Sequence, residues 1–525
     1  MVMNAAAWLA SSTLAVSSAL PVAPAVPVAE GGGGGLTKWL VLGGLFVLGS
    51  LIVMVWARWV RTMHLALGFA ATAALWAVGY VSMMQPGLAL GEILFATMLA
   101  ILFVAGFVAG RFGDHDVRPV SVGLVSAFAN LLVLGAFLRD EQHGSKVTPL
   151  VYVAGLFIAS ALLAWLGGVF GRAARSARDA SPLPNATALF AVVAATTVFL
   201  LLITGGLVTS YESGLAVPDW PNSYGHNMLL YPVSEMKGGI FYEHAHRLYG
   251  MLVGTTALVL VVVVWRSERE SWLRSLAVIT LLAVCFQGYL GGTRVTGNLT
   301  LSQQAQDLAP SIVRAIFHGV FAQLVFASFL TVAAATSRTW KESRPILPRA
   351  KPTSEAPELD GRGLSDASLI TDRSVALILP WAFVIQSALG ALYRHLQPPG
   401  GVTAEGHPMW AILAHMAMAV VVTALVVIAG GRAWGHSAHP VLRRLGLFLM
   451  HGVGVQLCLG VAAVAAVWIR TDAAIPGWEA IIVTTHQVTG AGLLGGAVLL
   501  AAWSKRLILP VGDARRMSAG AATQT

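Results

Sequence analysis

The sequence predicts an all-α integral membrane protein with about 13 transmembrane helices, eight of which form two pseudo-repeated four-helix bundles. Three observations lead to this prediction: an apolar composition, apolar stretches long enough to cross a bilayer, and residues that recur at one offset. Of the 525 residues, 56% are hydrophobic and only 11% are charged. Soluble proteins contain about 25% charged residues, so a soluble enzyme of this length is excluded.

Residues 1–36 are rich in Ala, Ser, Pro and Val and end in five glycines. The segment contains no Lys or Arg, whereas a secretory signal begins with a basic region and a mitochondrial transit peptide is rich in Arg. We therefore expect a disordered tail rather than a signal peptide, and a bacterial inner (cytoplasmic) membrane rather than a mitochondrial one.

Thirteen apolar stretches follow, each near the length of roughly 20 residues that crosses a hydrocarbon core. They are about twice the length of a barrel strand and do not alternate, which excludes a transmembrane β-barrel. The predicted spans are 37–59, 64–84, 90–110, 119–138, 147–170, 187–210, 241–265, 273–291, 312–335, 374–395, 409–431, 444–468 and 479–503.

Lysine and arginine set the predicted orientation, because cytoplasmic loops are enriched in them. The net charge of +9 is concentrated in alternate loops, a pattern that indicates orientation rather than a nucleic-acid partner. The linker 336–373 and the tail 504–525 are thereby predicted to be cytoplasmic, and the loop 211–240 to face outside. The linker separates a first bundle, 187–335, from a second, 374–503.

An internal repeat relates these two bundles. His246 and His415 are 169 positions apart, and His318 and His486 are 168 apart. The segment Gln287-Gly-Tyr-Leu-Gly291 matches Gln456-Leu-Cys-Leu-Gly460 at an offset of 169. Three features at nearly one offset indicate a duplicated unit.

The four histidines are predicted to lie at a similar depth. At about 1.5 Å per residue, each falls about 10 Å below the outer end of its helix. Imidazole in a membrane span is costly, and such residues are usually functional. A pair of histidines on facing helices of a bundle is typical of axial ligands to a haem iron. We therefore predict two haems, one per bundle, towards the outer face, with His246, His318, His415 and His486 as ligands.

Two arginines accompany the histidines of the first bundle. Arg247 follows His246 directly, and Arg314 lies one helical turn before His318. They are candidates either for pairing with haem propionates or for anchoring the helix at the membrane interface.

Glu243 distinguishes the first bundle from the second. It lies three residues before His246, on the same helical face, whereas Ile412 occupies the matching position of the second repeat. An acid near a helix N-terminus is also favoured by the helix dipole. The functional alternative is that the first bundle carries out chemistry with Glu243, while the second transfers electrons.

Residues 187 to about 505 resemble the haem A synthase family. The resemblance rests on the order and spacing of its motifs rather than on any one of them. These are Gly205-Gly-Leu-Val-Thr209, Ser213-Gly-Leu-Ala216, Pro218-Asp-Trp-Pro221, Glu243-His-Ala-His-Arg247, Gln287-x-x-Leu-Gly-Gly-Thr-Arg-Val295, His318-Gly-Val-Phe-Ala-Gln323, Gln386-x-x-Leu-Gly-Ala-Leu-Tyr-Arg-His395 and His486-Gln-Val-Thr-Gly-Ala491.

The resemblance implies oxidation of the C8 methyl group of haem O to the formyl group of haem A. It further implies that His246 and His318 flank the substrate haem, that His415 and His486 hold a haem b, and that Glu243 is the catalytic acid. Haem O synthase and cytochrome oxidase assembly proteins are the implied partners, beside membrane lipid. The sequence indicates no particular electron acceptor or donor.

Two departures from the family pattern stand out. Many bacterial members carry a cysteine pair in the first outer loop, but the only cysteines here are Cys285 and Cys458, both in predicted spans. A redox role for that loop is thus excluded. Met416 follows His415 at a position where members of the family commonly have Arg. This difference removes a cation that would contact a haem propionate on that side, and it leaves the prediction of His415 as a ligand unchanged.

Residues 37–170 lie outside the resemblance and form an expected accessory five-helix region without a cofactor pattern. For the whole chain, a non-catalytic dihaem b electron-transfer protein is the alternative to a synthase. A haem transporter is disfavoured because no polar groups mark the inner half of the spans.

Overall fold

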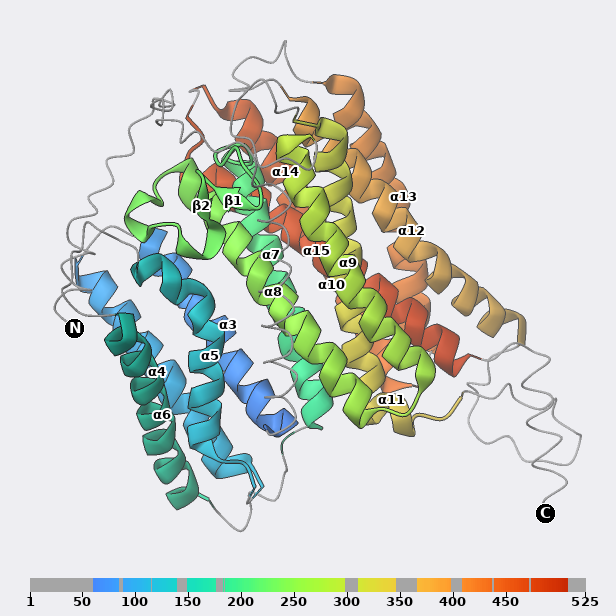
Figure 1. Cartoon of the computed structure of the whole chain (residues 1–525). Coiled ribbons are helices and arrows are strands. Elements are labelled where there is room, and N and C mark those ends of the chain that lie inside the picture. The colour runs from blue at the N-terminus through green and yellow to red at the C-terminus, as the bar shows by residue number, and fades with distance from the viewer. Residues whose placement is uncertain are drawn as a thin grey trace, which may run out of the picture. The chain divides into compact units, whose positions relative to one another are not determined.

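The computed structural model describes residues 60–84, 88–114, 116–138, 149–175, 183, 185–297, 310–345, 366–397, 408–436, 439–471 and 474–508. Twelve helices within these ranges are long and apolar enough to cross a membrane, and the chain is a multi-pass membrane protein. They are α3 (Thr62–Met84), α4 (Leu88–Phe112), α5 (Pro119–Leu138), α6 (Pro149–Ala173), α7 (Ala186–Ser210), α8 (Gly239–Ser267), α9 (Ser271–Thr296), α10 (Ile312–Thr336), α12 (Asp366–Leu396), α13 (Met409–His436), α14 (Pro440–Ile469) and α15 (Gly477–Leu507) (Figure 1).

Each predicted span from 64–84 onward is a helix, so the all-helical prediction is confirmed. Several helices are longer than the apolar stretch that predicted them; the predicted stretch 241–265, for example, lies within the helix Gly239–Ser267. Large apolar side chains remain exposed on these helices, including Ile158 at 66% and Val313 at 76%, as expected where lipid is the solvent. The predicted tail 1–36 and the span 37–59 lie outside the described residues, as does most of the linker.

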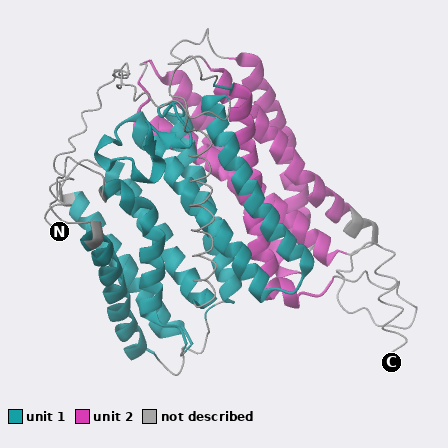
Figure 2. Cartoon of the chain, viewed as in Figure 1, with its two compact units in different colours: residues 1–311 teal, residues 312–525 magenta. Residues whose placement is uncertain are grey.

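The chain divides into two compact units, 1–311 and 312–525 (Figure 2). Helix α10 belongs to the second unit, where it packs against α12 and α15. The first bundle predicted from the sequence repeat, 187–335, includes α10. The boundary between the two compact units therefore differs from the boundary between the two repeats. The two-bundle domain scheme remains a prediction.

In the first unit, α4 and α6 pack closely because glycines face the partner backbone. A Cβ atom on Gly106 would lie 2.0 Å from the carbonyl oxygen of Ala164, and one on Gly167 would lie 1.9 Å from that of Phe103. Small residues that allow such close approach are a principal means of helix association in membranes.

We expect Gly106→Ala to destabilise the first unit, because its methyl group overlaps the α6 backbone, which cannot rotate away. Overpacking of this kind costs about 1–3 kcal/mol. Thermal unfolding in detergent measures the loss. Gly79→Ala on α3 is the matched control, since its Cβ would meet only the Met98 methyl at 4.0 Å. Equal melting temperatures for the two variants would contradict this packing.

Helix α3 joins the accessory helices to α7 and α8 through aromatic contacts. Phe69 meets Phe190 of α7 edge-on at 5.5 Å, and Trp76 meets Tyr249 of α8 edge-on at 5.3 Å. The Trp76 indole also donates to Asn130 of α5 at 2.8 Å, which satisfies its polar group within the membrane. The accessory region therefore supports the helix that carries Glu243 and His246.

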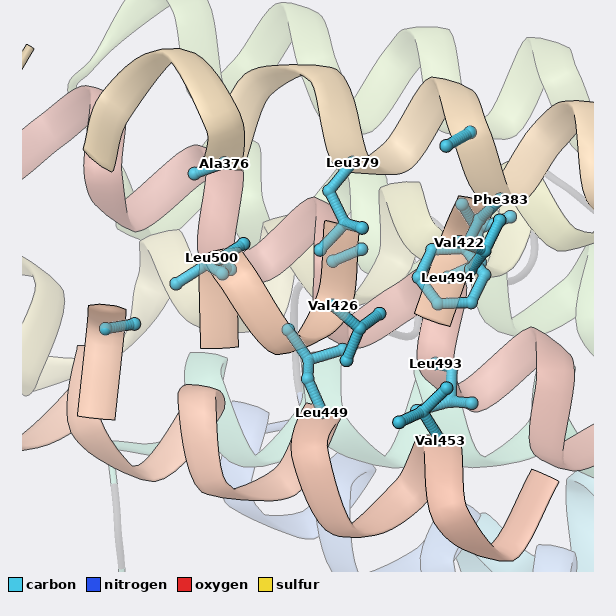
Figure 3. Packing of buried hydrophobic residues seen from close by; sticks show 14 of the residues in the cluster. Ala376, Leu379, Phe383, Val422, Val426, Leu449, Val453, Leu493, Leu494 and Leu500 are labelled. Carbon is cyan, nitrogen blue, oxygen red and sulfur yellow. The ribbon is translucent and has the colours of Figure 1, made fainter. Parts of the chain in front are cut away.

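In the second unit, α12 to α15 share one apolar core (Figure 3). Leu379, Val426, Leu449 and Leu494 are almost completely buried in it. Short elements complete the described structure: the antiparallel strands β1 (Asn222–Ser223) and β2 (His226–Asn227), the 3-10 turns η2 (Met228–Leu230) and η3 (Val233–Glu235), and α11 (Arg338–Glu342).

Candidate functional site

The second unit brings His415 of α13 and His486 of α15 together. Their ring centroids lie 6.3 Å apart and the ring planes are inclined at 74°. A metal–imidazole bond of about 2 Å, the length known from zinc sites, places a ring centroid about 3 Å from the metal. Two rings on opposite sides of one metal would then be separated by about 6 Å. The spacing of these two rings therefore fits axial ligation of one haem iron.

A glycine makes room for each of these rings. A Cβ on Gly390 of α12 would lie 2.9 Å from His415 Cε1, and one on Gly460 of α14 would lie 3.1 Å from His486 Cε1. Each imidazole thus lies against the backbone of the preceding helix. Any larger residue at either glycine would have to displace the ring.

Two glutamines, four residues before those glycines, contact the same histidines. The Gln386 side-chain amide nitrogen lies 3.2 Å from both His415 ring nitrogens, and the Gln386 carbonyl lies 3.1 Å from Nδ1. The Gln456 amide donates to the His486 carbonyl at 3.0 Å. The Gln-x-x-Leu-Gly segments were predicted to mark the repeat and the family resemblance, without a contact to the histidines. Their recurrence before successive histidine helices was the signal that could have assigned them to the histidines.

In the first unit, His246 of α8 has a comparable setting. A Cβ on Gly205 of α7 would lie 2.9 Å from His246 Cε1, and Thr204 Oγ1 is 3.1 Å from His246 Nδ1. The side chains of all four predicted ligands are half-buried. His246, His318 and His415 follow the first residue of their helices by seven, six and six positions, and His486 by nine.

Arg247 is held by protein groups on several sides. Its Nε donates to Glu243 Oε1 at 3.1 Å, and both side chains are buried, at 7% and 8% exposure. The rest of its guanidinium donates to the carbonyls of Val217, Asp219 and Asn222, at 2.9, 2.6 and 3.0 Å. In this arrangement Arg247 fastens the loop 211–238 to α8 and orients Glu243. The contact of Arg247 with a haem propionate remains a prediction.

The loop 211–238 has a second attachment through Asp219, which is completely buried. Its carboxylate accepts from the Tyr224 and Gly225 amides at 2.7 and 2.8 Å. Burial, and then the nearby Asp219 charge, raise the pKa of Tyr224, whose hydroxyl donates to the Ala216 carbonyl. These bonds order a loop that has no disulfide.

His244 lies on the opposite side of α8 from the predicted ligand. It is completely buried, and its Nδ1 is 3.0 Å from Ser223 Oγ of β1. These contacts fit a packing role for His244 rather than iron ligation. Its ring also contacts Tyr231 at 4.8 Å.

Arg294 is a residue that the sequence reasoning did not select. It lies in the last turn of α9, and its Nη2 donates to the Gly214 carbonyl at 3.3 Å. Two residues earlier, Gly292 lies against the Trp220 ring, where a Cβ would be 2.1 Å away. The Gly-Gly-Thr-Arg motif therefore contacts the same loop, 211–238.

The remaining predicted residues lie in the second unit. His318 and Arg314 are both partly buried on α10. The pairing of His318 with His246 rests on the repeat and remains a prediction. Ile412, which matches Glu243 in the repeat, is buried. The second unit has a buried ion pair at another position: Arg470 Nε lies 3.1 Å from Glu479 Oε2, and the two side chains are 4% and 6% exposed.

The fold and this site define a class: a multi-pass membrane protein with histidines in its membrane spans that lie against glycines of a neighbouring helix. Comparison with known proteins narrows the class. The model of the COX15-CtaA family, described as cytochrome oxidase assembly protein, matches residues 188–475, more than half of the chain. The chain belongs to this family.

A curated relative supports the assignment. A protein named heme A synthase, from Rhodospirillum centenum, is 27% identical over 371 residues, which cover 62% of this chain and 89% of the relative. No solved structure matches the chain significantly. The family match begins at residue 188, so helices α3 to α6 precede it.

Proposed function

We propose that the protein is a haem A synthase, which oxidises the C8 methyl group of haem O to a formyl group for use by cytochrome oxidases. The observation that carries the proposal is the His415–His486 pair, whose spacing fits one haem iron. Membership of the COX15-CtaA family and the relative named heme A synthase support the reaction.

In this proposal His415 and His486 hold a haem b, and His246 and His318 flank the substrate haem O. The bound haem b supplies one-electron redox chemistry, while the protein supplies ligands and charge. Conversion of a methyl to a formyl group takes up the oxygen of a water and releases electrons, which pass to an external electron acceptor, together with protons, which a carboxylate beside the substrate can accept. Glu243 lies three residues before His246 and is oriented by Arg247, so it is the proposed proton acceptor.

The proposed membrane is the bacterial inner membrane, with the haem sites towards the outer face. This orientation rests on the distribution of Lys and Arg between alternate loops. Haem O synthase, which would deliver the substrate, and proteins that assemble cytochrome oxidase are the proposed partners.

The proposed reaction is tested by expressing the protein in a host that makes haem O but no haem A, and then extracting the haems for chromatography. A haem A or hydroxylated haem O peak that depends on this protein is the expected result. Haem b alone, with the spectrum of a bis-histidine haem, would reject the synthase and favour the non-catalytic electron carrier.

His415→Ala is expected to remove the haem b from the purified protein, because a bis-histidine site loses half of its axial ligation. Haem content per chain, measured as the pyridine haemochrome, reports the loss. His451→Ala is the matched control: His451 is an exposed histidine in the membrane span α14, bonded to the Leu447 carbonyl of its own helix at 2.8 Å. A normal haem b content in His415→Ala would rule out His415 as a ligand.

A further inference from the structure

Helix α5 of the accessory region lies directly against the loop 211–238. A Cβ atom on Gly135, in the last turn of α5, would lie 2.5 Å from the Leu229 carbonyl oxygen and 2.9 Å from Leu230 Cδ2. Both leucines belong to η2, the 3-10 turn within this loop. The glycine therefore permits contact between the backbone of an accessory helix and the backbone of the loop.

From η2 the connection continues to the hairpin of the loop. Asn227 is the N-cap of η2, and its Oδ1 accepts from the Leu229 amide at 2.9 Å. Asn227 is also the last residue of β2 and pairs with Asn222 of β1. One side-chain bond and one strand pair therefore join η2 to β1.

The hairpin in turn contacts α8 beside Glu243. The Asn222 carbonyl accepts from Arg247 Nη1 at 3.0 Å, and Arg247 Nε donates to Glu243 Oε1 at 3.1 Å. Ser223 Oγ lies 3.0 Å from Nδ1 of His244, the residue that follows Glu243. A continuous series of contacts thus connects α5 to the Glu243 carboxylate.

We propose that Gly135 is a positioning residue for Glu243, and that the accessory helix α5 takes part in the reaction by holding the loop that orients this carboxylate. The proposal rests on the proposed function, in which Glu243 accepts a proton. Ordinary contact between a Cβ and another heavy atom begins at 3.4 Å, so Gly135→Ala must separate α5 and η2 by about 1 Å. Close-packed groups transmit such a displacement, and misplacing a catalytic group by about 1 Å can lower a rate by about 100-fold.

The test compares Gly135→Ala with Gly123→Ala in the full-length protein. Gly123 lies on the same helix, and its Cβ would be 2.2 Å from the Ser160 carbonyl oxygen of α6, so this variant disturbs the packing of α5 without touching the loop. We expect both variants to melt at a lower temperature than the wild type. Only Gly135→Ala is expected to show faster hydrogen exchange at the Tyr224 and Gly225 amides, which are hydrogen-bonded within the loop.

Haem A formation and haem content per chain are then measured for both variants in the host that makes haem O. For Gly135→Ala we expect haem A formation about 100-fold slower at unchanged haem content, which separates turnover from haem binding. Gly123→Ala is expected to retain wild-type turnover per folded chain. Wild-type exchange of the loop in Gly135→Ala, or equal turnover in the two glycine variants, would overturn the proposal.

Asn227→Ala tests the next contact and keeps the proposal testable if Gly135→Ala does not fold. It removes the N-cap of η2, so we expect faster exchange in the loop and slower haem A formation. Asn185→Ala is its matched control, because Asn185 caps α7 through the same kind of bond, to the Thr187 amide at 3.0 Å, at the opposite end of α7 from the loop. Wild-type exchange and turnover in Asn227→Ala would overturn the proposal. A wild-type protein that forms no haem A would reject the proposed function instead, and exchange of the loop would still decide whether α5 holds it.

Discussion

Arg247→Ala is expected to release the loop 211–238 and to destabilise the protein by about 3–5 kcal/mol, the usual cost of removing one partner from a buried ion pair. The guanidinium joins the buried Glu243 carboxylate to three carbonyls of the loop 211–238, and an alanine leaves all four acceptors without this donor. Thermal unfolding in detergent and the rate of protease cleavage within the loop measure the two effects.

Arg266→Ala is the control for this experiment. Arg266 is exposed at the other end of α8, and exposed substitutions usually change stability by no more than about 0.5 kcal/mol. Arg247→Lys adds a second comparison, because a lysine retains the charge without the planar fork that reaches three carbonyls. We expect it to fall between wild type and Arg247→Ala. An Arg247→Ala protein with wild-type melting and cleavage would show that the loop is held by other bonds.

The sequence predicted the helices well because bilayer thickness imposes a length on each apolar stretch. The span predicted at 187–210 is observed as Ala186–Ser210. The span predicted at 479–503 is observed as Gly477–Leu507; its additional residues include Trp478 at one end and Ser504, Lys505 and Arg506 at the other. Such flanking residues are tolerated at the interface and are missed by a hydropathy pattern.

The shape of the loop 211–238 could not be predicted in the same way. Its shape depends on side chains distant in sequence, such as Arg247 with Val217, and on Asp219 with two following amides. No local periodicity encodes these bonds. The absence of cysteines from this loop was visible in the sequence, but the buried carboxylate and guanidinium that order the loop were recognised only from the structure.

The histidine repeat indicated a site without indicating its supporting groups. The offsets of 169 and 168 residues marked the four predicted ligands, because a duplicated unit preserves its spacing. Gly205, Gly390 and Gly460 depend instead on which helix faces which. The grouping of α10 with α12 and α15 is likewise a property of packing, which the register of a repeat does not contain.

Glu243→Gln is expected to retain haem but to lower the formation of haem A by at least about 100-fold, the lower end of what a positioned proton acceptor contributes. Glutamine is nearly isosteric, and its oxygen can still accept from Arg247 Nε, so the loop and the ligand helix keep their connection. What is lost is the negative charge and the ability to take a proton. Chromatography of the extracted haems measures the product, and the haemochrome measures the bound haem.

The difficulty with this variant is that breaking any buried ion pair can disturb the protein. Glu479→Gln separates the two effects, because Glu479 pairs with Arg470 in an equally buried pair of the second unit, seven residues before His486. Both variants are expected to lose similar stability, and only Glu243→Gln to lose haem A formation. If both retained turnover, Glu243 would be a structural partner of Arg247; if both lost it, the defect would be one of folding. Loss of turnover in Glu243→Gln alone, at matched stability, is the result that assigns proton transfer to this carboxylate.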